Sequence, residues 1–279
     1  MRVYPALRIR LADPAPSRVG ELLAILDDFQ VTAVDDSDDD VRVFFTRESE
    51  RDAAVERLRA EADLTVTIED VPDDDWAARS QAGIAPITVG SLTIAPPWAA
   101  DAARATNSGP TIVIQPSMGF GTGHHPSTRL CVRLLQQSSL AGLSVLDVGT
   151  GSGVLAIAAA TLGAARVVGL DVDPDALTNA RENLDLNGLT GRVELIERDL
   201  SASAGDLEPG DIVLANLTGG LLCRDAATLA ALVAPGGTLI ASGFQTHELD
   251  EVTAAFEAAG LRRRARIEEE SWIGATFKT

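Results

Sequence analysis

The first part of the chain alternates between the apolar period of a strand and that of a helix. Apolar residues recur at helical spacing in residues 17–26 and 47–62, and both segments are predicted to be helices. Four further segments have the short apolar patterns of strands: residues 4–11, 31–34, 41–46 and 64–71. The order β-α-β-β-α-β is that of a ferredoxin-like fold, so we predict a small α+β domain at residues 1–71.

Residues 72–109 show no regular period. Four prolines interrupt this segment: Pro72, Pro86, Pro96 and Pro97, and proline is a strong local breaker of helices and strands. The segment also contains Trp76 and Trp98, which solvated linkers rarely carry. We therefore predict an irregular linker that packs against the protein.

From about residue 110 onward, strand-like and helix-like patterns alternate. Helices are predicted at residues 152–162, from Pro174 onward, and around 220–233 and 246–259. The predicted strands are residues 144–149, 166–172, 193–199, 211–217, 237–242, 262–268 and 271–277. This alternation predicts a Rossmann-like, doubly wound sheet of seven strands in residues 110–279, in which the last strand runs antiparallel to its neighbours.

The charge balance restricts the partners of the chain. Its 279 residues include 23 Lys+Arg and 41 Asp+Glu, for a formal net charge of -18. A large nucleic-acid interface needs a basic face, so we expect no direct nucleic-acid partner, whereas a basic protein is compatible. The basic run of residues 262–266 is interpreted as a solvated face balanced by residues 268–270, with a nucleic-acid surface as the alternative.

Cysteine usage and apolar runs indicate the compartment. Cys131 and Cys223 are too few for a disulfide framework. The N-terminus has no apolar signal core, and no run of about 18 apolar residues is present. We expect a cytoplasmic protein without a membrane span, and a monomer because no interface stripe is visible.

A glycine-rich turn follows the strand predicted at 144–149. Residues 145–153 read Val-Leu-Asp-Val-Gly-Thr-Gly-Ser-Gly. Such a turn lets the backbone approach a ligand and directs a helix N-terminus toward it. The third glycine comes one residue too early for the dinucleotide fingerprint G-x-G-x-x-G, so a nucleoside without a pyrophosphate fits better.

A carboxylate follows the next strand at the spacing expected for a ribose contact. Asp171 lies 22 residues after Gly149, and a carboxylate there can accept hydrogen bonds from both ribose hydroxyl groups. The alternative for Asp171 is a loop residue or the N-cap of the helix that starts at Pro174. Asp173 suits the cap better.

Several segments carry a resemblance to a known family. Residues 119–128, Gly-Phe-Gly-Thr-Gly-His-His-Pro-Ser-Thr, closely resemble the G-T-G-x-H-P-T-T segment of the ribosomal protein L11 methyltransferases. Residues 71–76, 96–98, 215–217 and 269–272 are similar to that family's linker, strand-end and C-terminal motifs. The glycine turn with Asp171 resembles more broadly the class I methyltransferases that depend on S-adenosylmethionine.

The resemblance implies a fold, a cofactor and residue roles. It implies a ferredoxin-like substrate-recognition domain before a class I methyltransferase domain, with S-adenosyl-L-methionine as the cofactor. The residues that it places at the cofactor are Thr128, Gly149, Gly151, Asp171 and Asn216. It places Phe120 and residues 121–123 beside the cofactor and the acceptor amine, and Phe120, Thr122 and Asn216 form the predicted catalytic set.

Asn216, Asp147 and Asp199 are also candidates on physical grounds. Asn216 ends a strand at the carboxyl edge of the sheet, where α/β proteins bind ligands, and its side-chain oxygen can accept a hydrogen bond from an amine. The alternative is an asparagine that only closes a turn. Asp199 is a candidate for the adenine amino group. Asp147 is predicted either to anchor the glycine turn or to lie near the methionine end.

Metal and hydrolase chemistry are poorly supported. The chain has three histidines, His124, His125 and His247, and no cysteine at metal-ligand spacing. We expect no metal site, and interpret the histidine pair as part of a His-Pro turn. Ser152 and Ser242 lack the spacing of a nucleophile elbow.

The predicted reaction is methyl transfer from S-adenosylmethionine to lysine or α-amino groups of ribosomal protein L11. Departures from the family pattern leave the substrate open. His124 and Ser127 stand where the family usually has threonine, and residues 217–220 read Leu-Thr-Gly-Gly where Ile-Leu-Ala-Gly is common. One alternative is a methyltransferase of the same fold with another protein or a small molecule as substrate. The other is a noncatalytic module that binds a nucleoside or a protein.

Overall fold

The computed structural model describes residues 3–11, 22, 25, 26, 29, 31–35, 40–59, 61, 63–72, 84–116, 123–199 and 207–279. The chain divides into two compact units. One is built mainly from Met1–Ile84, and the other from Ala85–Ser117 and Gly121–Thr279.

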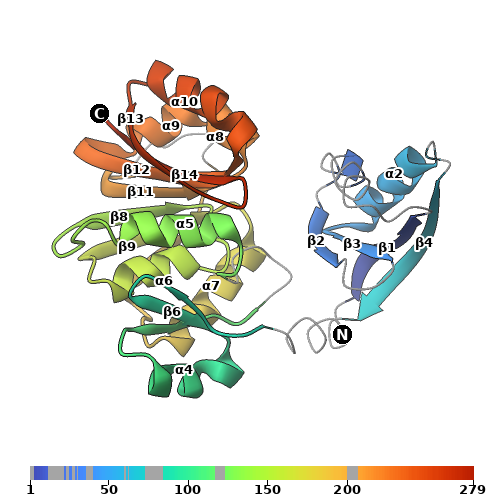
Figure 1. The fold of residues 1–279 in the computed structure, drawn as a ribbon, viewed down its shortest axis with the longest axis horizontal. Coiled ribbons are helices and arrows are strands. Elements are labelled where there is room, and N and C mark those ends of the chain that lie inside the picture. Colours follow the sequence, from blue (N-terminus) through green and yellow to red (C-terminus); the bar gives the residue numbers. More distant parts are fainter. Residues whose placement is uncertain are drawn as a thin grey trace. The chain divides into compact units, whose positions relative to one another are not determined.

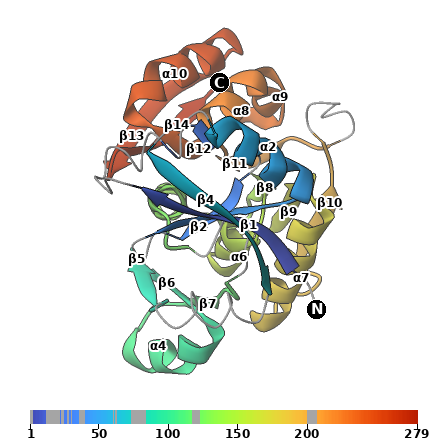
Figure 2. The same cartoon turned by 90° about the vertical axis from the view of Figure 1, so that its right-hand side faces the viewer.

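The first unit contains a four-stranded antiparallel sheet (Figures 1 and 2). Its elements are β1 (Val3–Leu11), β2 (Val31–Asp35), β3 (Val41–Phe45), α2 (Glu48–Leu58) and β4 (Leu64–Pro72). The strand order is β2-β3-β1-β4, and every pair is antiparallel. This order confirms the ferredoxin-like prediction. Leu22 and Leu26 of the first predicted helix are helical and fully buried, and they share a core with α2 and the strands.

The segment from residue 87 to residue 113 is more regular than the predicted linker. It forms β5 (Ile87–Val89), β6 (Leu92–Ala95), the 3-10 helix η2 (Pro97–Ala99), α4 (Ala100–Thr106) and β7 (Thr111–Val113). The three strands make their own sheet in the order β5-β6-β7. Val89, Leu92 and Ile94 are buried in the core of the second unit, so these residues belong to that unit.

The second unit is organised around a seven-stranded sheet (Figure 1). Its strands are β8 (Ser144–Val148), β9 (Arg166–Asp171), β10 (Val193–Glu197), β11 (Gly210–Asn216), β12 (Val233–Gln245), β13 (Arg262–Glu269) and β14 (Trp272–Lys278). They lie in the order β10-β9-β8-β11-β12-β14-β13. β8 pairs in parallel with β9 and β11, whereas β14 is antiparallel to β12 and β13. The predicted doubly wound sheet is confirmed.

Helices cover both faces of this sheet. One core contains side chains of α5 (Pro126–Leu135), α6 (Val154–Thr161) and α7 (Pro174–Leu186). The other contains side chains of α8 (Gly219–Arg224), α9 (Ala226–Ala231) and α10 (Leu249–Ala258). Buried apolar residues at the middle strands, such as Leu214 and Val213, fall alternately into the two cores, because successive side chains of a strand point to opposite faces. Among the described helices, none is long and apolar enough to cross a membrane.

Two asparagines, one in the last turn of α7 and one at its C-terminal cap, connect this helix to β7 and to the residues that follow it. The Asn187 side chain accepts a hydrogen bond from the Val113 N–H (2.7 Å) and donates to the Val113 carbonyl oxygen (2.7 Å). One turn earlier, Asn183 accepts from the Gln115 N–H (2.7 Å) and donates to the Ser152 carbonyl oxygen (2.9 Å). Val113 is 3% exposed, so the two bonds of Asn187 give partners to the backbone groups of a buried residue.

We predict that Asn187→Ala lowers the free energy of unfolding by about 2–4 kcal/mol, because a buried N–H and a buried carbonyl group lose their side-chain partner. Urea unfolding followed by circular dichroism measures the change. Asn179→Ala is the matched control on the same helix: no hydrogen bond of Asn179 is found within the described parts of the chain, so its midpoint should stay near the wild-type value. Equal midpoints for the two variants would contradict the assigned role of Asn187.

Candidate active site

The glycine turn joins β8 to α6 and is fixed to the end of β9. Gly149 and Thr150 both donate backbone N–H groups to the Leu170 carbonyl oxygen, at 2.8 and 2.9 Å. Gly149 has a φ of 70°, and a Cβ atom there would lie 2.6 Å from Cδ2 of Leu217. Glycine adopts this left-handed conformation without the strain that a side chain would bring. The turn brings together the carboxyl ends of β8 and β9 and Leu217, the residue that follows β11.

Asp147 lies beneath this turn and is 1% exposed. Its Oδ2 atom accepts hydrogen bonds from the Thr150 hydroxyl group (2.7 Å) and the Ala156 N–H (3.0 Å). Burial raises the pKa of the Asp147 carboxyl group to about 6, although the two hydrogen bonds oppose the shift. Two roles were predicted for Asp147, and these contacts favour the first, that of an anchor between the glycine turn and the start of α6.

Asp171 lies at the end of β9 and faces the same turn. Oδ2 accepts a hydrogen bond from the Gly151 N–H (2.8 Å), and Oδ1 accepts one from the Asp173 N–H (3.0 Å). Each oxygen retains acceptor capacity because a carboxylate can accept about four hydrogen bonds. Asp173 accepts from the Asp175 N–H (2.9 Å) and caps α7, as the sequence predicted.

Val172 lies at this edge of the sheet and was not among the candidate residues that the sequence indicated. It lies directly after Asp171, and it is 62% exposed. A large exposed apolar side chain beside a partly exposed carboxylate gives this edge of the sheet an apolar and a polar surface side by side. The only sequence signal was its position, one residue past the end of an apolar strand.

Asn216 ends β11, and its side chain lies against α5. The Nδ2 group donates to the Thr128 hydroxyl oxygen (3.3 Å). The Oδ1 atom is buried and has no hydrogen-bond partner among the residues that the structure describes. Thr128 is 1% exposed. A buried carbonyl oxygen without a partner costs free energy, and this cost marks Asn216 as a position where a ligand can supply the missing donor.

The remaining candidates are placed less completely. Asp199 follows β10 and is exposed, and the neighbouring Arg198 donates its N–H to the Asp171 carbonyl oxygen (2.8 Å). Phe120 and Thr122 lie outside the described residues. Within the described ranges, no three His, Cys, Asp or Glu side chains are grouped so that they could bind a metal ion.

The two adjacent histidines make structural contacts at the start of α5. The His124 ring donates from Nε2 to the Ala85 carbonyl oxygen (2.7 Å). Nδ1 of His125 accepts from the Ser127 N–H (3.3 Å) and hydroxyl group (2.7 Å), which caps the helix. His125 also packs edge-on against Trp272, with ring centroids 4.4 Å apart. Its burial lowers the pKa of the His125 imidazole, and this favours the neutral form that can accept a bond.

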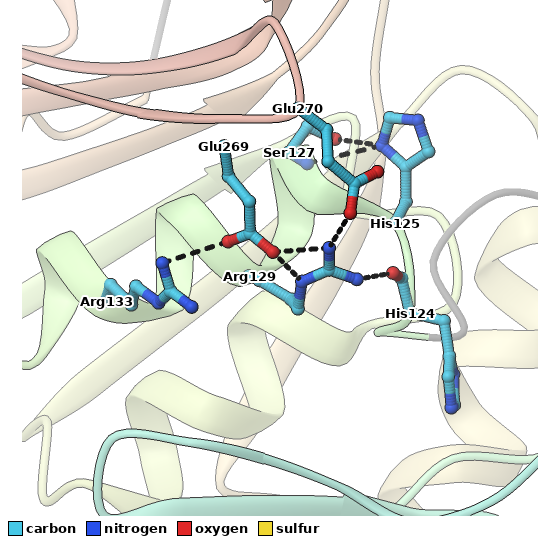
Figure 3. A network of polar contacts seen from close by, with 7 residues as sticks. All are labelled: His124, His125, Ser127, Arg129, Arg133, Glu269 and Glu270. Atoms are coloured by element: carbon cyan, nitrogen blue, oxygen red, sulfur yellow. Dashed lines mark hydrogen bonds and ion pairs between the residues drawn. The ribbon is translucent and has the colours of Figure 1, made fainter.

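A charged network connects α5 to the end of β13 (Figure 3). Arg129 donates to the His124 carbonyl oxygen and to Glu269 (2.7 Å), and Arg133 lies 2.9 Å from the other oxygen of Glu269. Glu270 lies 3.5 Å from Arg129. Glu269 had been expected to balance the arginines of its own strand, but the register of the terminal hairpin turns it toward α5. Nothing local in the sequence indicates a pair 140 residues apart.

The fold and this edge of the sheet define a class of protein. The strand order with β14 inserted antiparallel between β12 and β13, and the glycine turn at the carboxyl edge, are those of a class I methyltransferase with a Rossmann-like fold. The family model described as "Ribosomal protein L11 methyltransferase (PrmA)" matches residues 18–279. The chain belongs to the ribosomal protein L11 methyltransferase family.

Individual relatives resemble the chain over most of its length. The ribosomal protein L11 methyltransferase of Geobacter metallireducens is 39% identical over 260 residues, which cover 88% of this chain and 84% of the relative. That of Deinococcus radiodurans is 37% identical over 233 residues, 82% of each chain. A crystal structure of ribosomal protein L11 methylase from Lactobacillus delbrueckii subsp. bulgaricus has a TM-score of 0.64 and 28% identity, covering 70% of this chain and 98% of that one.

The raised pKa of Asp147 makes stability depend on pH. Its folded pKa of about 6 lies above the unfolded value of 3.8, so the native state binds more protons between these values. The contribution of Asp147 to the free energy of unfolding is therefore fully present below about pH 4 and is lost as the pH rises through about 6. Relative to Asp147→Asn, which retains an acceptor oxygen, the wild type should lose about 1 kcal/mol between pH 5 and pH 8.

Urea unfolding of both proteins across this pH range measures the difference. Asp211→Asn is the control, because hydrogen bonds from Ser144 lower the pKa of the Asp211 carboxyl group. The stability that ionised Asp211 contributes is lost only at lower pH. The difference in the free energy of unfolding between Asp211→Asn and wild type should therefore stay constant from pH 5 to pH 8. A constant difference for Asp147→Asn would contradict the buried-carboxyl assignment.

Proposed function

We propose that the protein transfers methyl groups from S-adenosylmethionine to amino groups of ribosomal protein L11, lysine side chains or the α-amine. The observation that carries the proposal is the buried Oδ1 atom of Asn216, which has no partner among the described residues and can accept a hydrogen bond from an amine. Membership of the family and the names of the relatives support the choice of L11.

The described residues fit the cofactor. Asp171 would accept hydrogen bonds from the ribose hydroxyl groups, since its oxygens retain acceptor capacity beyond the two backbone bonds. The backbone of Gly149 and Gly151 would approach the ligand closely, with Thr128 beside it. The exposed side chain of Val172 would pack against the adenine, and Asp199 would accept from the adenine amino group. When bound, S-adenosylmethionine supplies a methyl group already activated on a sulfonium.

Asn216 would orient the acceptor. An amine must be neutral to attack, and a neutral amide oxygen accepts one of its hydrogens without the charge that would stabilise the ammonium form. The lone pair of the amine is then left to face the methyl group, so the enzyme contributes mainly alignment. The resemblance adds Phe120 and Thr122 to the acceptor side. Water can remove the released proton, so a dedicated base is not required.

The two units would have separate tasks. We infer that the ferredoxin-like unit, expected at residues 1–71, recognises the protein substrate, and that the seven-stranded unit carries out the transfer. A net charge of -18 suits a basic ribosomal protein through long-range attraction. A ribosomal substrate also fits the cytoplasmic location and the absence of a nucleic-acid partner expected from the sequence.

The direct test incubates the purified protein with radiolabelled S-adenosylmethionine and purified L11. We expect label in L11, at its lysine side chains or α-amine by peptide mass spectrometry. Cofactor binding without labelled L11 would favour a methyltransferase of the same fold with another substrate. Calorimetry that detects no cofactor binding would favour the noncatalytic alternative.

Substitutions at the two strand ends should separate binding from rate. Asp171→Ala should raise the dissociation constant of the cofactor about 10- to 150-fold, because a hydrogen bond to a charged acceptor contributes about 1.5–3 kcal/mol. Asn216→Ala should mainly lower kcat, by about 10- to 100-fold. Calorimetry and initial rates measure the two effects. Asp173→Ala, at a cap two residues from Asp171, is the control and should leave cofactor affinity near wild type; unchanged affinity in Asp171→Ala would exclude the ribose contact.

A further inference from the structure

We propose that Asn183 is a positioning residue for the cofactor: its side chain holds the end of the glycine turn, residues 149–153, in the conformation that binds S-adenosylmethionine. The proposal deepens the function proposed above and rests on it for the identity of the cofactor. Asn183 lies in the last turn of α7 and is 1% exposed. Both ends of its amide are bonded to backbone groups of the protein, so it acts on the ligand through them.

The two hydrogen bonds of Asn183 join the glycine turn to the segment that follows β7. Nδ2 donates to the Ser152 carbonyl oxygen at 2.9 Å, and Oδ1 accepts from the Gln115 N–H at 2.7 Å. A carbonyl oxygen can only accept a hydrogen bond and a backbone N–H can only donate one. Both partners therefore specify the same orientation of the Asn183 amide.

The bond to Ser152 fixes the last peptide group of the turn. On the other side of that peptide group, the Gly153 N–H donates to the Thr150 carbonyl oxygen at 2.8 Å. The turn thus holds the N–H of this peptide group, and α7 holds its carbonyl oxygen. Because a peptide group is planar, bonds at both ends fix its rotation, whereas the loss of Asn183 would leave only one end held.

The same helix packs closely on the turn beside this bond. Gly153 has a φ of 80°, and a Cβ atom there would lie 3.2 Å from Cβ of Ala180. Ala180 is fully buried, and it lies three residues before Asn183, on the same side of the helix. The hydrogen bond to Ser152 therefore adds a polar contact of defined direction to an apolar contact between α7 and the turn.

The other end of α7 is connected to the proposed ribose carboxylate. Oδ1 of Asp171 accepts from the N–H of Asp173, the residue that caps α7, and Oδ2 accepts from the Gly151 N–H. One helix therefore contacts both sides of the proposed cofactor site, Asp171 at its start and the glycine turn through Asn183. A site whose groups are already in place binds a ligand more tightly than one that is ordered on binding, so the Asn183 bond should raise cofactor affinity.

The experiment measures the dissociation constant of S-adenosylmethionine by calorimetry, and kcat at saturating cofactor. Asn183→Ala removes both hydrogen bonds. Asn183→Asp, ionised at pH 8, keeps an acceptor for the Gln115 N–H but has no hydrogen for the Ser152 carbonyl group. We expect each variant to raise the dissociation constant about three- to tenfold. We expect kcat to change less than about twofold, because Asn216, which orients the acceptor, lies on β11.

Asn187→Ala is the matched control, one helical turn further along. It loses two hydrogen bonds to the backbone of buried Val113, but none of the described bonds of Asn187 reaches the glycine turn. It should therefore lose a comparable amount of stability in urea and keep the cofactor dissociation constant within about twofold of wild type. Equal loss of affinity in Asn187→Ala and Asn183→Ala would overturn the proposal, as would wild-type affinity in either Asn183 variant.

A second readout needs no cofactor and so separates this proposal from the function on which it rests. In the protein without ligand, we expect the backbone amides of Gly151 and Gly153 to exchange hydrogen about three- to tenfold faster in Asn183→Ala than in Asn187→Ala. Equal exchange in these two variants would overturn the proposal even if L11 is methylated. Wild-type protein that binds no S-adenosylmethionine would contradict the proposed function, whereas faster exchange in Asn183→Ala would still support Asn183 as the residue that holds the turn.

Discussion

The backbone N–H groups of Gly149 and Thr150 both donate hydrogen bonds to the carbonyl oxygen of Leu170. The candidate site depends on these two hydrogen bonds. Parallel pairing brings the ends of β8 and β9 together but does not determine the path of the chain beyond them. The two hydrogen bonds do so, because they fix the first two residues of the turn against β9. The carboxylate of Asp171, one residue later, can then accept from Gly151, and α6 starts at the same edge of the sheet.

Outside the seven-stranded sheet, polar side chains form hydrogen bonds with backbone groups that a neighbouring strand would otherwise pair. Asn187 pairs with both backbone groups of Val113 much as a neighbouring strand would. At the start of α5, Arg129 satisfies a carbonyl group and is itself neutralised by Glu269. Buried backbone N–H and C=O groups require hydrogen-bond partners. In the short connections around the candidate site, few of these partners come from helices or strands. Stability and the geometry of the site are therefore linked through the same residues.

Local signals in the sequence were sufficient for much of this fold. The glycines at alternate positions identified the turn, and Asp173 before Pro174 identified a helix cap that the structure confirms. The strands of residues 87–113 were missed because runs of three or four residues are too short to show a period. The pair formed by Arg129 and Glu269 was missed because its members are 140 residues apart. The cofactor-binding and catalytic roles of the site residues stay predictions, and Phe120 and Thr122 lie outside the described residues.

Apart from β5, β6, β7, α4 and α5, the sequence by itself determined the order of strands and helices. It also determined the position of the turn and the family, because each depends on residues that are neighbours along the chain. Tertiary structure decided two properties of the same residues that no local pattern contains. The pKa of Asp147 rises because its neighbours remove it from water. The side chain of Asn216 donates a hydrogen bond to Thr128, a residue 88 positions away. Dehydration and hydrogen bonds between distant residues both arise from packing, and packing exists only in the folded chain.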